Sequence, residues 1–361
     1  MWSDGENCAE KRMRVLFVTC GSIDDPSSRV RVHQFLPFFS RQGEHVATIS
    51  LDANGQFRRR LRQLMILLLS TRFDTVVVQK AVLPRLTAAL SKLSKRLIYD
   101  IDDGVFVYYP ELDRVLHRYD VVVTGNRALE EHVRRFNSRS VIIPSVVDET
   151  RFDLQQMQTT HSDTNPLVVG WVGNGWHLEY LEALKDSFFE LARRFQNRFV
   201  LKVVSNRSLD WSADWLVNKG WCLEQEAQDV ASFDIGIMPL PQDPWSELKC
   251  GYKALLYMAM GKPVVVSPIG VNSEIVRHGI NGYHASNSAE WTQYLGTLLQ
   301  DAVLRARLGS AGRQIVADEY CIRAVLPRWL AVLRGDLEMA RDPARVPKSA
   351  EDGSQAAGAF D

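Results

Sequence analysis

The hydrophobic and polar positions of the chain repeat one pattern, in which short runs of β-branched and apolar residues alternate with amphipathic stretches. Arg14–Thr19 is the first run, and it ends at Cys20-Gly21, where a tight turn is expected. Helical spacing follows at Val32, Phe35, Leu36 and Phe39. We predict further strands at residues 46–51, 75–79, 96–100, 121–124 and 140–143. Strands that alternate with helices in this way form a parallel, doubly wound sheet.

This periodicity stops in the polar stretch 148–166 and then restarts, with strands expected at 167–172, 199–205, 234–239 and 263–267. The predicted fold class is therefore α/β, with two Rossmann-like doubly wound domains facing across a cleft. We expect a leader at 1–12, an N-terminal domain at 13–150, a linker at 151–166 and a C-terminal domain at 167–320. A last helix at 321–340 would pack back on the first domain, before a disordered tail at 341–361.

Charge and cysteine content narrow the classes of protein that the chain can represent. Lys plus Arg equals Asp plus Glu at 43 each, so no global field attracts nucleic acid. The five cysteines are scattered without a CxxC pair, which predicts reduced thiols in a cytoplasmic protein. The longest apolar run, LMILLL at residues 64–69, is too short to span a bilayer. We therefore expect a soluble cytoplasmic protein without nucleic-acid partners.

Two lysines of the second half are the first candidates for chemistry. A helix predicted at 248–260 places Lys249 and Lys253 on one stripe in its first turns. The positive end of the helix dipole disfavours cations there, so an anion held between them would explain the pair. The alternative is that both are solvated surface lysines.

The residues around these lysines carry a specific resemblance. The lines DIGIMPL, KCGYKALLYMAMGKPVV and SPIGVNSEIVRHGINGY closely resemble the donor domain of retaining, group 1 (family 4) glycosyltransferases of the GT-B type. The resemblance covers residues 14–335 and is most specific in 234–291. It implies transfer of a sugar from a UDP- or GDP-linked donor, with retention and without a metal or other cofactor. The acceptor would be a sugar, a lipid-linked molecule or another small molecule.

The resemblance also implies which residues bind the donor. Gly270, Val271 and Asn272 fall where the family holds the diphosphate, and Glu274 falls on the acid after that loop. The glycine turn after the first strand of the same domain supplies a further diphosphate contact, at Gly173 and Asn174. Lys249 and Lys253 match lysines of a subgroup, and the predicted catalytic role of Lys253 is to stabilise the departing diphosphate.

The sequence departs from the family at two glutamates that usually bind the ribose and the sugar, because Leu248 and Leu256 occupy their positions. A non-catalytic relative that binds sugar nucleotides or serves as a scaffold is therefore the alternative function. A nicotinamide-dependent oxidoreductase is disfavoured, since neither domain opens with GxGxxG.

Polar side chains that follow the strands of the first domain are the candidate acceptor site. Ser22, Ser28 and Arg29 come after the first strand, where hydroxyls and guanidinium groups suit phosphorylated or polyhydroxylated acceptors. The alternative is a serine-capped helix with an exposed arginine. Asn126, which follows the fifth predicted strand, is expected to line the same cleft.

Asp100-Ile101-Asp102-Asp103 ends another strand. Alternation would place Asp100 and Asp102 on one side, where they could contact acceptor hydroxyls or cap a helix. A divalent metal held by the pair is the alternative, which the metal-independent resemblance disfavours. We predict that Asp102 is the catalytic residue nearest the transferred bond.

One segment combines basic and apolar residues. FRRRLRQLMILLLSTR, residues 57–72, would suit peripheral contact with a membrane at the inner face, through an interfacial helix on anionic lipid. The alternative, which the pattern slightly favours, is a core helix with a basic solvated end.

Overall fold

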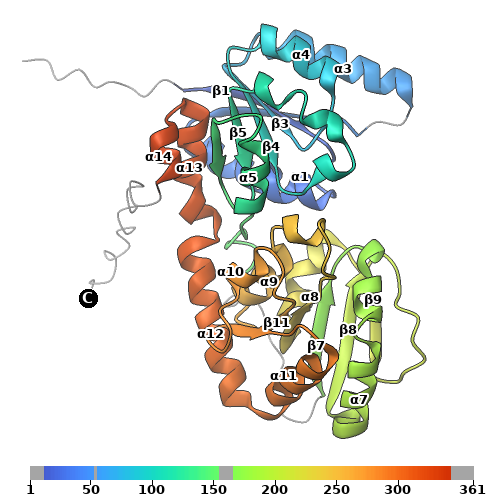
Figure 1. The fold of residues 1–361 in the computed structure, drawn as a ribbon. Helices are drawn as coiled ribbons and strands as arrows, with labels where there is room; N and C mark the ends of the chain where they lie inside the picture. Colours follow the sequence, from blue (N-terminus) through green and yellow to red (C-terminus); the bar gives the residue numbers. More distant parts are fainter. Residues whose placement is uncertain (1–11, 53–54, 154–165, 343–361) are drawn as a thin grey trace, which may run out of the picture.

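The computed structural model describes residues 12–52, 55–153 and 166–342 as two α/β domains stacked one above the other (Figure 1). The sheet of the N-terminal domain is entirely parallel and has the order β2-β1-β3-β4-β5-β6. Its strands are β1 (Arg14–Thr19), β2 (His45–Ser50), β3 (Thr75–Gln79), β4 (Leu97–Ile101), β5 (Val121–Thr124) and β6 (Ser140–Ile142). The helices around it are α1 (Pro26–Arg31), α2 (Leu36–Arg41), α3 (Gln56–Ser70), α4 (Pro84–Leu93) and α5 (Arg127–Val133).

The second sheet is also parallel and has the order β12-β11-β10-β7-β8-β9. Its strands are β7 (Leu167–Val172), β8 (Phe199–Ser205), β9 (Leu216–Gly220), β10 (Ile235–Met238), β11 (Val264–Val266) and β12 (Gly282–His284). The helices of this half are α6 (Glu179–Glu182), α7 (Lys185–Phe195), α8 (Glu226–Ala231), α9 (Tyr252–Ala259), α10 (Asn272–Ile275), α11 (Ser288–Gln300) and α12 (Ala302–Glu319). The predicted fold class, two Rossmann-like domains, is confirmed.

Apolar side chains cover both faces of each sheet, so the inner strands are buried on both sides. All residues of β3 and β5 are buried, as parallel strands covered by helices on both sides require.

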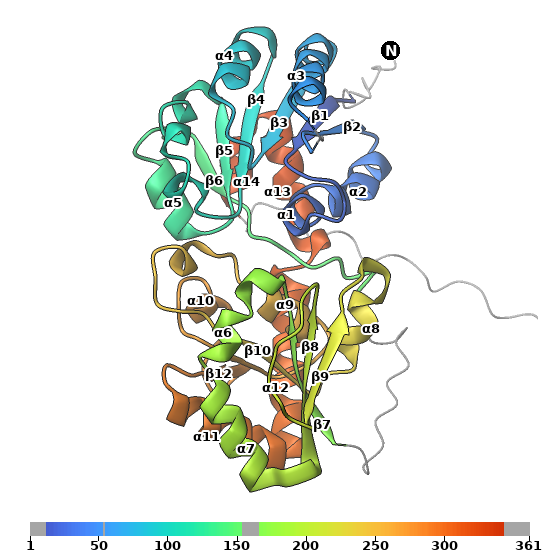
Figure 2. The same cartoon turned by 90° about the vertical axis from the view of Figure 1, so that its right-hand side faces the viewer.

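The C-terminal end of the chain returns to the first domain. Helices α13 (Ile322–Arg334) and α14 (Leu337–Arg341) pack on the N-terminal domain (Figure 2). The ring centroid of Trp329 lies 6.2 Å from that of Phe35. The C-terminal segment therefore contributes to the core of the first domain.

Two predicted helices differ from the observed ones, and two observed strands were not predicted. The helix expected at 248–260 begins only at Tyr252, because Gly251 adopts a left-handed conformation with φ +67°. The last helix is divided at Gly335, whose φ is +96°, and α14 follows the break. Strands β9 and β12 were not predicted, since β9 is a largely exposed edge strand and β12 has only 3 residues.

The interpretation of residues 57–72 as a core helix holds for one side of the helix only, where Ile66, Leu67 and Leu69 pack on the domain core. Helix α3 buries only Ile66 and Ser70, and it leaves five large apolar side chains exposed. Its hydrophobic run is therefore divided between the domain core and the surface.

Candidate active site

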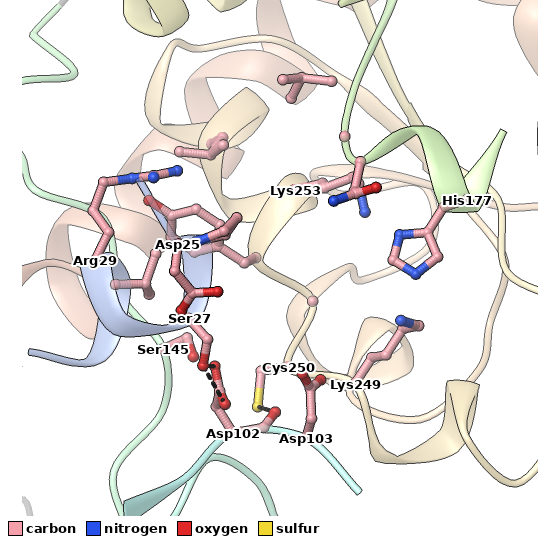
Figure 3. Close-up of a pocket in the computed structure, with 18 of the residues that line it drawn as sticks. Asp25, Ser27, Arg29, Asp102, Asp103, Ser145, His177, Lys249, Cys250 and Lys253 are labelled. Carbon is pink, nitrogen blue, oxygen red and sulfur yellow. Dashed lines mark hydrogen bonds between the residues drawn. The ribbon is translucent and has the colours of Figure 1, made fainter. Parts of the chain in front are cut away.

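A cavity of about 520 Å³ lies between the two domains, where the carboxyl ends of both sheets meet (Figure 3). Its N-terminal wall comes from the segments after β1, β3 and β4, and its C-terminal wall from those after β7 and β10 and from the start of α9. Ligands of open parallel sheets bind at this edge, because the strand order reverses there and leaves a crevice. The cavity is therefore the candidate active site.

Lys249 and Lys253 line this cavity, although only Lys253 belongs to a helix. Lys249 has extended backbone angles, φ −73° and ψ 151°, and it precedes the left-handed turn at Gly251. A side chain at Gly251 would lie 2.6 Å from the Cδ1 atom of Ile275, so this turn needs glycine. The two lysines thus approach the cavity from the turn and from the first turn of α9, not from one helical stripe as predicted.

Neither lysine forms an ion pair with any carboxylate of the described residues. The Lys253 ammonium lies 5.6 Å from the ring centroid of Trp171, and that of Lys249 lies 5.4 Å from the ring centroid of Trp245. Burial and the neighbouring Lys249 lower the pKa of Lys253 to about 7. Burial also lowers the pKa of Lys249. Asp103 attracts both lysines from a longer distance, but two cations held together without an ion-paired carboxylate still create a site that favours an anion.

The turn after β7 forms the neighbouring part of the same wall. Gly173 is closely packed, because a Cβ there would lie 2.7 Å from the Lys253 Cε atom. The Asn174 side chain caps the following turn by accepting a hydrogen bond from the Trp176 N–H at 3.0 Å. His177 comes next, and burial together with the two lysines lowers its pKa to about 3. Its imidazole is therefore neutral near pH 7, with one N–H donor.

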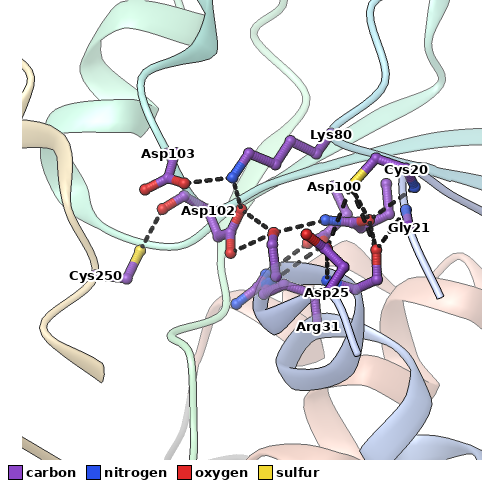
Figure 4. A network of polar contacts seen from close by, with 12 residues as sticks. Cys20, Gly21, Asp25, Arg31, Lys80, Asp100, Asp102, Asp103 and Cys250 are labelled. Atoms are coloured by element: carbon purple, nitrogen blue, oxygen red, sulfur yellow. Dashed lines mark hydrogen bonds and ion pairs between the residues drawn. The ribbon is translucent and has the colours of Figure 1, made fainter. Parts of the chain in front are cut away.

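A network of charged groups forms the opposite wall (Figure 4). The Ser27 hydroxyl lies 2.7 Å from both carboxylate oxygens of Asp102, and the Lys80 ammonium lies 3.6 Å from one of them. Lys80 also donates to Asp103. Burial disfavours the charge of Asp102, but the attraction of Lys80 and Arg31 and the hydrogen bond from Ser27 outweigh it and lower its pKa. Asp102 is an ionised carboxylate at the cavity wall, as its predicted role needs.

Arg29 joins the two domains at one end of the cavity. Its guanidinium lies 3.6 Å from the Glu226 carboxylate and 5.1 Å from the ring centroid of Trp221. Trp221 in turn donates its indole N–H to Glu226 at 3.0 Å. All three residues line the cavity. The alternative of an exposed arginine is therefore wrong, because Arg29 is buried.

Other predicted acceptor residues do not line the cavity. Asp100 lies inside the N-terminal domain, where Arg31 donates to both of its carboxylate oxygens at 3.1 and 2.5 Å. Ser28 is buried and donates to Gln79 at 3.0 Å, while Ser22 is exposed outside the cavity. Because Asp100 is paired with Arg31, it does not form an open metal-binding pair with Asp102.

The loop that carries Gly270 also lies outside the residues that line the cavity. Gly270 has φ +53°, and its N–H donates to the Glu247 carboxylate at 3.0 Å. Asn272 is buried, with its amide donating to the Ser267 carbonyl at 3.2 Å, while Val271 is half-buried and Glu274 is exposed. The Gly270 N–H, which we expected to contact the diphosphate, therefore already donates its hydrogen bond to a carboxylate.

Asn126 joins the domains instead of lining the cavity. Its side-chain amide donates to the carbonyls of Leu248 and Lys249 at 3.1 and 3.2 Å, and its oxygen caps α5. Leu248 packs against Gly104, where a Cβ would lie 2.2 Å from its Cδ1 atom. Leu256 lines the cavity. One of the two positions where the resemblance expects glutamate is thus an apolar interdomain contact, and the other is an apolar part of the wall.

Sequence reasoning missed Lys80, His177 and Asp103 as cavity residues. Lys80 has φ +59°, an uncommon conformation for a residue other than glycine, and it directly follows the buried strand β3. A charged residue at the end of an apolar strand was the available signal. For His177 the signal was its place after the glycine turn, in Gly173-Asn174-Gly175-Trp176-His177.

Comparison with known families finds a match for the second domain. Residues 166–301 match the family described as glycosyl transferases group 1. The C-terminal domain is therefore similar to group 1 glycosyltransferases. The match covers the whole C-terminal wall of the cavity. No curated protein matches the chain in sequence.

Solved structures support the observed fold along nearly the whole length of the chain. HepE from Anabaena, in complex with UDP and glucose, is 14% identical with a TM-score of 0.68, covering 90% of this chain and 100% of that chain. A glycosyltransferase from Rickettsia africae is 14% identical with a TM-score of 0.67, covering 92% and 99%. Sucrose-phosphate synthase from Thermosynechococcus elongatus is 13% identical with a TM-score of 0.65, covering 90% and 99%. At these identities the likeness shows the GT-B fold.

Proposed function

We propose that this chain is a glycosyltransferase that moves a sugar from a UDP- or GDP-linked donor to an acceptor, using the interdomain cavity as its active site. The observation that carries the proposal is the convergence of Lys249 and Lys253 without a carboxylate partner among the described residues. HepE, one of the similar structures, is a complex with UDP. A nucleoside diphosphate would supply the anion that this lysine pair favours.

The donor diphosphate would lie between the two lysines and the N-terminus of α9. The first N–H groups of a helix have no partner within it, and they add to the positive end of the dipole. Gly173 and Asn174 lie beside Lys253, so the backbone can approach the phosphates closely there. His177 would donate its N–H to a donor oxygen. We omit Gly270 from these contacts, because Glu247 accepts its N–H.

Chemistry in this arrangement depends mainly on charge. Negative charge grows on the diphosphate as the bond to the sugar breaks, and nearby lysines stabilise that charge more than they stabilise the bound donor. Asp102, held by Ser27 and Lys80, would orient the acceptor hydroxyl or accept its proton. We further propose retention at the sugar carbon and turnover without a metal. NMR of the first product would report its anomeric configuration, and chelation with EDTA should leave turnover unchanged.

Thermal unfolding tests the donor site. UDP or GDP should raise the melting temperature, while NAD should leave it unchanged. A ligand present at a hundred times its dissociation constant adds about 2.7 kcal/mol to the state that it binds. Failure of every nucleoside diphosphate at millimolar concentration would contradict the proposal.

The alternative is a non-catalytic relative that binds sugar nucleotides, favoured by Leu256 in place of a glutamate at the cavity wall. Slow hydrolysis of the donor without acceptor distinguishes the two, since only an enzyme would release the diphosphate. Binding of every UDP- and GDP-sugar without any hydrolysis would support the alternative.

A further inference from the structure

Helix α3 presents one apolar face to solvent. Its members lie at helical spacing and have exposed fractions of 79% for Phe57, 55% for Leu61, 53% for Leu64, 41% for Met65 and 65% for Leu68. We call these five residues the α3 face. Their positions i, i+4, i+7, i+8 and i+11 form a continuous stripe on one side of a helix. The opposite side carries Ile66 and Ser70, which are buried against the domain.

Arginines flank the stripe. Arg58 and Arg60 are exposed, and neither has an ion-pair partner among the described residues. At 100° per residue they fall on opposite borders of the α3 face. The helix sequence QFRRRLRQLMILLLS contains no acidic residue. An exposed apolar patch with a positive border is complementary to a partner that has both an apolar surface and negatively charged groups beside it.

The position of α3 keeps this surface separate from the active site. The helix lies at the outer end of the N-terminal domain, away from the C-terminal domain, in both views (Figures 1 and 2). None of the α3 face residues lines the cavity. The surface is therefore free to bind a partner while the cavity binds its substrates.

We propose that the α3 face docks on an anionic lipid bilayer, with its axis in the plane of the interface. The 15 residues of α3 are too few to span the hydrocarbon core, and no helix among the described residues is long and apolar enough to do so. An amphipathic helix with aromatic and leucine side chains on one side and arginines at the borders is typical of interfacial binding. The arginines attract the anionic headgroups, and the apolar side chains enter the boundary with the acyl chains.

A second copy of this chain is the weaker candidate partner. A symmetric dimer through α3 would pack together two helices that carry arginines and no acidic residue. Like charges that face each other across an interface disfavour association. An anionic bilayer satisfies both the apolar stripe and the positive borders.

Vesicle sedimentation of the full chain tests the proposal. Wild type should bind vesicles of phosphatidylcholine mixed with phosphatidylglycerol at least tenfold more strongly than vesicles of phosphatidylcholine alone. The triple variant Phe57→Ser, Leu61→Ser and Leu68→Ser should lose at least tenfold of that binding. The double variant Arg58→Gln and Arg60→Gln should lower the affinity for anionic vesicles about fivefold for each arginine removed. Added salt should weaken the binding of wild type.

A matched control removes exposed apolar side chains elsewhere. Val303 and Ile280 are 80% and 53% exposed on the other domain, so Val303→Ser with Ile280→Ser should bind vesicles like wild type. Melting temperature and affinity for UDP should be unchanged in all variants, which separates this proposal from the donor site. Equal binding to both vesicle types, or undiminished binding by the triple variant, would overturn it. A wild-type dimer that the triple variant loses, without vesicle binding, would assign the face to a second copy.

Discussion

Lys253 lies with its ammonium 5.6 Å from the ring centroid of Trp171, in a wall of the cavity that contains no carboxylate paired with it among the described residues. Burial and the charge of Lys249 lower its pKa to about 7, so the protonated fraction changes near neutral pH. An anion bound beside it would favour the protonated form and raise that pKa. We therefore expect anion binding in the cavity to be coupled to proton uptake by Lys253.

This coupling predicts the pH dependence of donor binding. The affinity for an inert nucleotide sugar should fall as pH rises through 7, because free Lys253 loses its charge there. The diphosphate of a nucleotide sugar has no terminal phosphate to titrate in this range. Lys253→Met should bind more weakly at pH 6 and should show a flatter profile, measured by calorimetry. An unchanged slope in the variant would assign the titration to another group.

Asp102 should affect turnover more than donor binding. Asp102→Asn keeps the shape but removes the charge that faces the acceptor, so kcat should fall about a hundredfold or more. Affinity for UDP should change less than about threefold, because the donor contacts lie on the other wall. As a control, Asp24→Asn alters a neighbouring exposed carboxylate of the cavity rim and should retain turnover. Turnover near wild type in Asp102→Asn would exclude the catalytic role.

Asn126 should influence the donor site through the segment that it holds. Asn126→Asp retains the oxygen that caps α5 but replaces the amide that donates to Leu248 and Lys249. Losing these bonds should cost about 1–3 kcal/mol of stability. It should also raise the KM for the donor, since the turn before α9 loses its interdomain contact. Asn126→Ala removes cap and contact together, and it should be less stable still. A donor KM that stays unchanged in both variants would limit Asn126 to a structural role.

Asp100 should act on stability alone. It is fully buried and paired with Arg31, so Asp100→Asn leaves an uncompensated charge and should lower the free energy of unfolding by about 3–5 kcal/mol. Urea unfolding measures this change. The fraction that remains folded should bind UDP with wild-type affinity. If Asp100→Asn lost UDP binding without a lower free energy of unfolding, Asp100 would have a direct role in the active site.

The fold followed from the sequence because strands buried on both faces appear as continuous apolar runs. The bounds of β1, β3 and β5 were predicted without error for this reason. Strands with weak patterns, such as the exposed β9, could not be found in this way. Periodicity therefore located the core and missed parts of the sheet edge.

The site was less predictable, because its geometry depends on where each element ends. Alternation placed Asp100 and Asp102 on one side, but β4 ends at Ile101, and beyond the strand that rule no longer holds. Lys80 reaches Asp102 through a left-handed backbone conformation that its sequence did not indicate. Lys249 was selected from a predicted helical stripe and then matched by the resemblance, although the observed helix begins only at Tyr252.

Calorimetric titration of UDP tests the central claim, that the lysine pair of the interdomain cavity holds the donor diphosphate. Lys249→Ala combined with Lys253→Ala should weaken UDP binding at least a hundredfold at pH 6.5, with little change in melting temperature. Lys185→Ala, an exposed lysine of α7 outside the cavity, is the matched control and should bind like wild type. Wild-type affinity for UDP in the double variant would contradict the account.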